Sequence, residues 1–176
     1  MGRPVRHASR NRPLIIRLAT PRDIAVLPDV ERSAGEAFRG GLHDWVADHT
    51  VTLAEAYPPR VAVDRVWVVE AEGAVRGFID IEMVDGELHI WELAVELAWQ
   101  KRGLGRALMD QALEVGRSKG CAAASLTTFH NIAWNAPFYR RLGFELLTSP
   151  SARLAAILRD EAERGLSDRC AMALKL

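Results

Sequence analysis

The 176-residue chain is poor in the features that mark several classes of protein. Its two cysteines, Cys121 and Cys170, lie far apart and match no metal-binding spacing, so we expect two reduced thiols. No run of about 18 apolar residues predicts a membrane span, and no apolar segment follows the basic start as in a secretory signal. Its 23 Lys and Arg residues balance its 23 Asp and Glu residues. We therefore expect a cytoplasmic protein without a membrane or nucleic-acid partner.

The chain divides into a short basic start and one domain. Residues 1–13 contain basic residues but no acid, and we expect a disordered tail there. An alternative is that this tail is an arm that binds nucleic acid or a protein partner. Residues 14–176 are long enough to bury the core of a single domain without disulfides.

The first third of the domain combines one strand with helical patterns. An apolar strand is expected over residues 14–18, and Thr20-Pro21 supplies the start of a helix that continues to about Ser33. Glycines then interrupt the pattern. Apolar residues recur at helical spacing over 42–53, and Tyr57-Pro58-Pro59 is expected to end that second helix.

The middle and end of the domain predict a mixed sheet. Strands over 61–70, 75–84 and 88–95 are separated by tight turns and should form an antiparallel meander. A helix from Gly103 to about Lys119 then leads to a parallel strand over 122–129. A short helix near 134–141, a strand to 148, a further helix and a strand over 169–176 complete the chain. We predict a mixed α/β fold with a twisted central sheet of about six to seven strands and helices on both faces.

Residues 93–109 organise this prediction, because they form a strand, a glycine-containing turn and a helix. Gly103 and Gly105 allow the backbone to approach a ligand, and the first N–H groups of the helix should point outward. The expected ligand is an anion such as a pyrophosphate. The turn lacks both the third glycine of a dinucleotide-binding motif and the Gly-Lys-Ser/Thr of a P-loop.

Two motifs with one strand between them carry a family resemblance. Gln100-x-x-Gly103-x-Gly105 is followed by Phe138-Tyr139-x-x-x-Gly143-Phe144 within the longer segment 134–144. In this order, the chain resembles the GNAT family of acyl-CoA-dependent N-acetyltransferases over about residues 14–148. The resemblance implies acetyl-CoA as the acyl donor and no metal.

The resemblance also implies which residues hold the cofactor. Main-chain groups of the strand before the turn would contact the pantetheine arm, the turn would wrap the pyrophosphate, and one asparagine would bond to the cofactor. The implied residues are Leu93, Ala94, Val95, Gln100, Lys101, Arg102, Gly103, Leu104, Gly105, Arg106 and Asn135.

The expected chemistry needs an acid for the leaving thiolate and a base for the amine. Tyr139 matches the family's tyrosine near the thioester sulfur and is our candidate acid. His89 occupies a strand position that serves as the base in some members. Glu92 is a second candidate, but strict strand alternation places it on the other face unless a bulge intervenes. Solvent and His130 are the remaining candidates.

We hypothesise transfer of an acetyl group from acetyl-CoA to a primary amine by direct attack. The acceptor is a small molecule or a peptide. A non-catalytic acyl-CoA sensor or interaction module is the rival function, since the turn alone would suffice for binding. Exposed sheet edges and tryptophans are compatible with a homodimer. His43 and His49, with Asp44 and Asp48, suggest a solvated helical face rather than a metal site.

Overall fold

The computed structural model describes residues 14–176, and the predicted basic tail over residues 1–13 lies outside these residues. Within them, a seven-stranded sheet has the order β1-β2-β3-β4-β5-β7-β6. The strands are β1 (Ile15–Leu18), β2 (Val66–Ala71), β3 (Ala74–Val84), β4 (Glu87–Val95), β5 (Ala123–Phe129), β6 (Glu145–Leu146) and β7 (Arg169–Lys175). The helices are α1 (Leu27–Gly35), α2 (Pro58–Ala62), α3 (Leu104–Ser118), α4 (Ala136–Arg141) and α5 (Ala152–Glu163).

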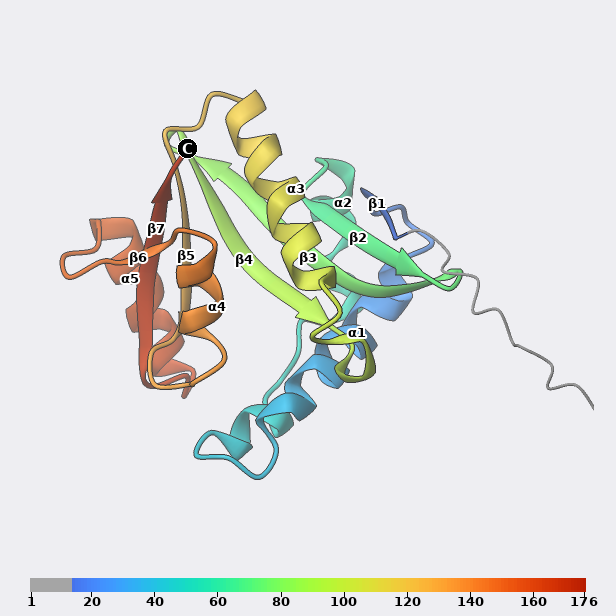
Figure 1. The fold of residues 1–176 in the computed structure, drawn as a ribbon, viewed down its shortest axis with the longest axis horizontal. Helices are drawn as coiled ribbons and strands as arrows, with labels where there is room; N and C mark the ends of the chain where they lie inside the picture. Colours follow the sequence, from blue (N-terminus) through green and yellow to red (C-terminus); the bar gives the residue numbers. More distant parts are fainter. Residues whose placement is uncertain (1–13) are drawn as a thin grey trace, which may run out of the picture.

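Helices cover both faces of this sheet, which confirms the predicted mixed α/β fold. Helices α3 and α4 lie in front of the sheet in Figure 1, and α1, α2 and α5 lie behind it. The expected meander is present, since β2, β3 and β4 pair antiparallel in sequence order. Strand β5 follows the α3 crossover and runs parallel to β4, also as expected.

Two hydrophobic cores hold these layers together. The larger core joins α3 to the front face of the sheet, where the α3 residues Leu104, Leu108 and Ala112 are almost fully buried. Their four-residue spacing makes one apolar stripe along the helix. The second core joins Leu27 and Val30 of α1 to the back face of β2, β3 and β4. The end of β4 is therefore packed from both sides.

The helix predicted over residues 42–53 is wrong. The chain forms short 3-10 turns there, at Asp44–Asp48 and Ala54–Ala56. Pro58 and Pro59 open α2 instead of stopping a helix, because proline fits the first turn, where its missing N–H is not needed. Of the apolar residues of this segment, Trp45 packs against Phe129 at the end of β5.

No helix within residues 14–176 is long and apolar enough to cross a membrane.

Candidate active site

Strands β4 and β5 separate along their length and leave a gap in the middle of the sheet. Their parallel pairing extends from Glu87 and Ala123 to Ile90 and Leu126 and then stops. Beyond Ile90, the edge of β4 that faces β5 has no strand partner as far as Val95, and Figure 1 shows the two strands diverging. Main-chain groups on this edge are available to an extended ligand.

The turn after β4 presents a row of free backbone amides beside this gap. Gly103 is the N-cap of α3 and has a φ of 88°, a left-handed conformation that favours glycine. Lys101 also has a positive φ, of 59°. Among residues 14–176, no acceptor faces the backbone N–H groups of residues 101–106. Together with the dipole of the 15-residue helix α3, these amides are suited to an anionic ligand.

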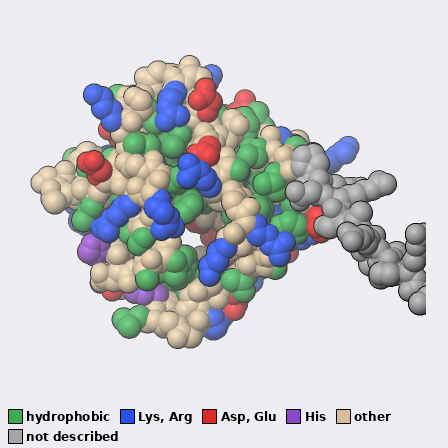
Figure 2. All heavy atoms as spheres, in the orientation of Figure 1, with side chains coloured by type: hydrophobic (Ala, Val, Ile, Leu, Met, Phe, Trp, Pro, Cys, Tyr) green, Lys and Arg blue, Asp and Glu red, His purple; other side chains and the backbone are tan. Residues whose placement is uncertain are grey.

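Basic side chains surround the same side of the molecule. Lys101, Arg102 and Arg106 are exposed at the start of α3, and Arg140 and Arg141 are exposed on α4. Figure 2 shows Lys and Arg side chains gathered around a hollow on the face that carries these two helices. The chain as a whole is neutral, so this is a local concentration of positive charge, which favours an anionic ligand.

Side-chain contacts fix the turn between β4 and α3. The Gln100 Nε2 atom donates to the backbone oxygens of Val95, at 3.1 Å, and Ala34, at 3.5 Å. The guanidinium groups of Arg76 and Arg102 lie 5.1 and 4.8 Å from the centre of the Trp99 ring. Gln100 therefore links the turn to β4 and α1, and it uses the carbonyl of Val95, one of the groups predicted to contact the cofactor.

A β-bulge decides where the two candidate bases point. In the register with β3, Asp80 pairs with Glu92 and Ile81 pairs with Ile90, so Trp91 is the extra residue. Because of this shift, His89 and Glu92 both face away from α3, although their three-residue separation would otherwise place them on opposite faces. The condition attached to Glu92 in the sequence prediction, an intervening bulge, is therefore met.

His89 is buried in the paired part of the sheet. Its Nδ1 atom lies 3.0 Å from the hydroxyl of Ser125, which also accepts a hydrogen bond from Arg153 at 3.2 Å. Burial and the charges of Arg153 and Arg65 lower the pKa of His89 to about 4. The side chain is 1% exposed, and the imidazole is neutral at physiological pH but only weakly basic. These surroundings suit a structural histidine.

Glu92 lies where the strands have separated and is half-buried. Burial, together with the neighbouring charge of Glu31, raises the pKa of its carboxyl to about 8. Glu31 comes from α1, and its carboxylate accepts hydrogen bonds from the backbone N–H of Thr52, at 3.2 Å, and the hydroxyl of Tyr57, at 3.3 Å. A carboxyl group with a pKa near 8 can exchange protons close to physiological pH.

Tyr139 projects from α4 and is partly buried. Its ring packs against Phe138 and Phe144, with centroid distances of 5.1 and 6.1 Å. Burial raises the pKa of the hydroxyl above its usual range, the charge of Glu92 adds to this effect, and Arg169 opposes it. The hydroxyl therefore stays protonated and can donate a hydrogen bond. Glu92 and Arg169 are the charged groups that act on this hydroxyl.

The remaining sequence candidates lie in the loop between β5 and α4. The side-chain oxygen of Asn135 accepts a hydrogen bond from the Thr128 hydroxyl at 2.7 Å, which fixes the side chain at the start of α4. His130 is exposed, and its Nδ1 atom lies 3.0 Å from the side-chain oxygen of Asn131. Asn135 is the N-cap of α4. No group of three or more His, Cys, Asp or Glu side chains within residues 14–176 is arranged to hold a metal ion.

Sequence reasoning missed two residues whose charges act on Glu92, namely Glu31 and Arg169. Glu31 lies in an ordinary amphipathic helix, and Arg169 opens the last strand, so neither stands in a motif. Arg169 donates to Glu161 at 2.9 Å and to the backbone oxygen of Thr127 at 2.9 Å, and its guanidinium lies 5.0 Å from the centre of the Phe129 ring. Only the packing of distant segments brings these two side chains to the gap.

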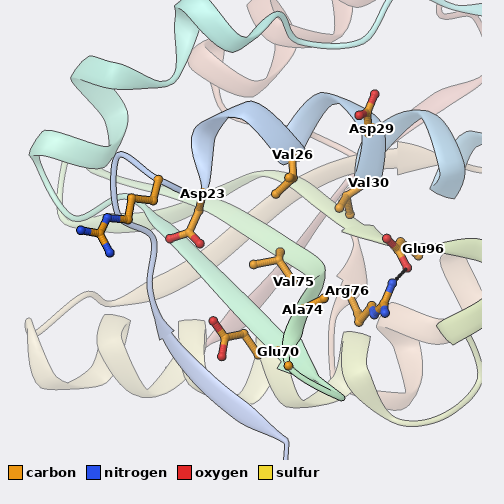
Figure 3. Close-up of a pocket in the computed structure, with 11 residues that line it drawn as sticks. Asp23, Val26, Asp29, Val30, Glu70, Ala74, Val75, Arg76 and Glu96 are labelled. Carbon is orange, nitrogen blue, oxygen red and sulfur yellow. Dashed lines mark hydrogen bonds and ion pairs between the residues drawn. The ribbon is translucent and has the colours of Figure 1, made fainter.

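A cavity of about 440 Å³ lies elsewhere, between α1 and the hairpin of β2 and β3. Figure 3 shows its acidic rim, with Asp23, Glu70 and Glu96, around the apolar side chains of Val26 and Val75. Arg17 pairs with Asp23 at 2.8 Å and also with Glu70, and Arg76 pairs with Glu96 at 3.0 Å. The acids of this rim are thus neutralised, and none of the predicted site residues lines the cavity.

Sequence comparison identifies a family for the segment that contains this site. Residues 62–146 match the model of the acetyltransferase (GNAT) domain. Over 56 residues, the chain is 38% identical to a glucosamine 6-phosphate N-acetyltransferase from Trypanosoma brucei brucei. This match covers 32% of the chain and 36% of the length of that enzyme, so the similarity is confined to about a third of each protein.

Solved structures resemble the whole fold. The PaiA N-acetyltransferase of Thermoplasma acidophilum, determined in complex with coenzyme A, superposes with a TM-score of 0.72 at 15% identity, covering 94% of this chain and 100% of its own. The ribosomal-protein-S18-alanine N-acetyltransferase of Escherichia coli gives a TM-score of 0.66 at 20% identity, with coverage of 93% and 94%. At these identities, the likeness establishes the fold. Residues 62–146 thus resemble the GNAT acetyltransferase domain, and the chain as a whole shares the fold of solved N-acetyltransferases.

Proposed function

We propose that this chain transfers an acetyl group from acetyl-CoA to a primary amine by direct attack of the amine. The observation that carries the proposal is the row of free amides over residues 101–106 beside the separated strands β4 and β5. These amides and the exposed basic residues around them suit the pyrophosphate of coenzyme A. Relatives of the fold, such as the Thermoplasma acidophilum PaiA enzyme, have been determined with coenzyme A.

The cofactor would be held by main-chain groups of β4 and by the turn. The unpaired edge of β4, which includes Leu93 and Ala94, offers backbone groups to the pantetheine arm, and Asn135 borders the same gap. Bound acetyl-CoA supplies a thioester that is activated for acyl transfer. The same backbone edge can hold the acyl group in line with the incoming amine, which removes much of the entropic barrier to the reaction.

Glu92 and Tyr139 would move the protons. An aliphatic amine is protonated at neutral pH, so a base must first remove a proton from its ammonium form. We assign this role to Glu92, because it lies at the gap with a raised pKa, whereas His89 lies in the paired part of the sheet with a lowered one. Tyr139 remains protonated and would donate to the departing sulfur. No covalent enzyme intermediate is needed.

Replacing Gly103 by valine should weaken acetyl-CoA binding by about tenfold or more, equivalent to about 1.4 kcal/mol. A β-branched side chain disfavours a φ of 88° and would turn the amides away from their ligand. Titration calorimetry with acetyl-CoA measures the effect. Gly120→Val is the matched control, since Gly120 follows the other end of α3, also has a positive φ (73°) and has open space around it.

Binding in this experiment separates the candidate functions. If Gly103→Val binds acetyl-CoA as tightly as the parent chain, the turn is not the pyrophosphate site. Saturable binding without thiol release from any amine would favour the non-catalytic sensor. A panel of amines, followed by the appearance of free coenzyme A thiol, tests for transfer itself.

A further inference from the structure

Two carboxyl groups at the gap lack the cationic partners that the other buried acids have. Glu31 and Glu92 are half-buried, and neither forms an ion pair with another residue of the described range 14–176. Every other buried or half-buried acid within residues 14–176 pairs with Arg, as Asp80 does with Arg60 at 2.7 Å and Arg65 at 3.2 Å. Burying an uncompensated carboxylate is costly unless a ligand supplies the missing charge.

The two carboxyl groups come from elements on the same face of the sheet and influence each other. Glu31 projects from α1 and Glu92 from β4, and the charge of each acts on Tyr57, which packs between these elements and α2. Burial raises the pKa of Glu31 as well as that of Glu92. Two neighbouring carboxyl groups in such surroundings tend to share one proton, which leaves the pair with about one negative charge.

The other charged and titratable groups around this pair do not cancel that charge. Those that act on Glu31 or Glu92 are Arg32 of α1, Tyr57 and Arg60 on the α2 side, Asp80 of β3, Tyr139 of α4 and Arg169 of β7. Arg60 is committed to Asp80 at 2.7 Å, Arg32 to Asp29 at 2.6 Å, and Arg169 to Glu161 at 2.9 Å. Each nearby guanidinium thus already has a carboxylate, and none contacts the pair.

An aromatic wall closes the β5 side of the gap. Phe129 ends β5, and Phe38 lies 5.6 Å from it and 4.8 Å from Trp134, measured between ring centroids. Trp45 also reaches Phe129, at 6.1 Å. This wall joins the segment after α1 to the end of β5, and Arg169 stacks on its central ring. Aromatic rings of this kind provide apolar contact for the carbon skeleton of a ligand.

We propose that Glu31 and Glu92 together bind the ammonium group of the acceptor, and that the acceptor is an amine with an apolar body and no anionic group beside its nitrogen. Glu31 is then a specificity-determining residue. This inference rests on the proposed acetyltransferase function and goes beyond it in naming the acceptor class. An amino acid or a sugar phosphate would bring its own negative charge close to the carboxyl pair and bind poorly.

The proton that the pair shares leaves to solvent first, and one proton then moves in this step. An N–H bond of the ammonium breaks, the proton passes to a carboxylate oxygen of Glu92, and the amine keeps the electron pair with which it attacks. Glu31 does not take the proton. It contributes negative charge that holds the ammonium and keeps Glu92 basic.

The test compares tyramine with tyrosine, which differ by the carboxylate beside the amine. Initial rates of acetyl-CoA-dependent thiol release should give a kcat/KM for tyramine at least about 10-fold above that for tyrosine, or about 1.4 kcal/mol. Glu31→Gln keeps the shape and a hydrogen-bond acceptor but removes the charge. It should reduce this preference, mainly by raising the KM for tyramine. Glu163→Gln, an exposed carboxyl on α5 with no ion pair, should leave the preference unchanged.

A pH profile distinguishes this role from a merely structural one. Without the charge of Glu31, the pKa of Glu92 falls, so the ascending limb of kcat/KM should move to lower pH in Glu31→Gln and return towards its original position in Glu31→Asp. Calorimetry with acetyl-CoA checks that each variant is folded.

The outcomes separate this proposal from the proposed function. If the parent chain acetylates both amines, and its kcat/KM for tyrosine equals or exceeds that for tyramine, the carboxyl-pair proposal is overturned. The proposed acetyltransferase function is unaffected by that result, which needs no variant. An unchanged preference and pH profile in a folded Glu31→Gln variant also overturn it. Acetyl-CoA binding without turnover of any amine in a broad panel overturns both proposals.

Discussion

Replacing Tyr139 by phenylalanine is expected to lower kcat by about 100-fold, within the range of general acid catalysis, while the affinity for acetyl-CoA stays almost unchanged. The ring contributes to packing against Phe138 and Phe144, and phenylalanine preserves these contacts. Only the hydroxyl is lost, and with it the hydrogen bond that we propose to the departing sulfur. Steady-state rates measure the first effect, and calorimetry measures the second.

The two measurements must differ for the acid role to hold. A loss of kcat with unchanged acetyl-CoA affinity is the signature of an interaction made in the transition state. An unchanged kcat would reject Tyr139 as the acid. Weaker binding with unchanged kcat would instead make the tyrosine a contact for the cofactor.

Replacing Glu92 by glutamine is expected to lower kcat/KM by about 100-fold or more and to change its pH dependence. In the parent chain, the base must be deprotonated to act. The rate should therefore rise about tenfold per pH unit below pH 8 and level off above it, because burial and Glu31 raise the pKa of Glu92 to about 8. In Glu92→Gln, this ascending limb should disappear.

The position of the limb also separates the two bases considered from the sequence. Burial lowers the pKa of His89 to about 4, so a profile controlled by His89 would already be flat above about pH 5. A limb near pH 8 that survives in Glu92→Gln would assign the base to another group or to solvent. Rates between pH 5 and 9, with one amine at saturating acetyl-CoA, decide between these outcomes.

The order of strands and helices around the turn was predictable because its causes are local. Tight-turn residues such as Asp85-Gly86 force neighbouring strands to be antiparallel, and the stripe on α3 requires a helix packed on the sheet. Gly103 and the apolar strand before it likewise identify a strand, turn and helix at the anion site. The error over residues 42–53 arose because helical spacing cannot distinguish a helix from turns that pack against β5.

The arrangement of the chemical groups depended on contacts between distant segments. The bulge at Trp91 places Glu92 on the same face of the sheet as His89. This bulge arises from the pairing of β4 with β3 and cannot be read from the residues of β4 alone. The separation of β4 from β5 likewise needs both strands to be placed. Because of these features, we favour Glu92 over His89 as the base.

Local sequence thus determined most of the elements and the glycine turn, since turn conformation and amphipathic periodicity are properties of short segments. Tyr139 was suggested by the family resemblance. Only the tertiary structure shows which carboxyl groups act on one another. Glu31 and Glu92 lie about 60 positions apart in the chain, and only the packing of α1 on the back of β4 brings both to the gap. Burial and mutual repulsion, which set their pKa values, arise from that packing and have no signature in either segment.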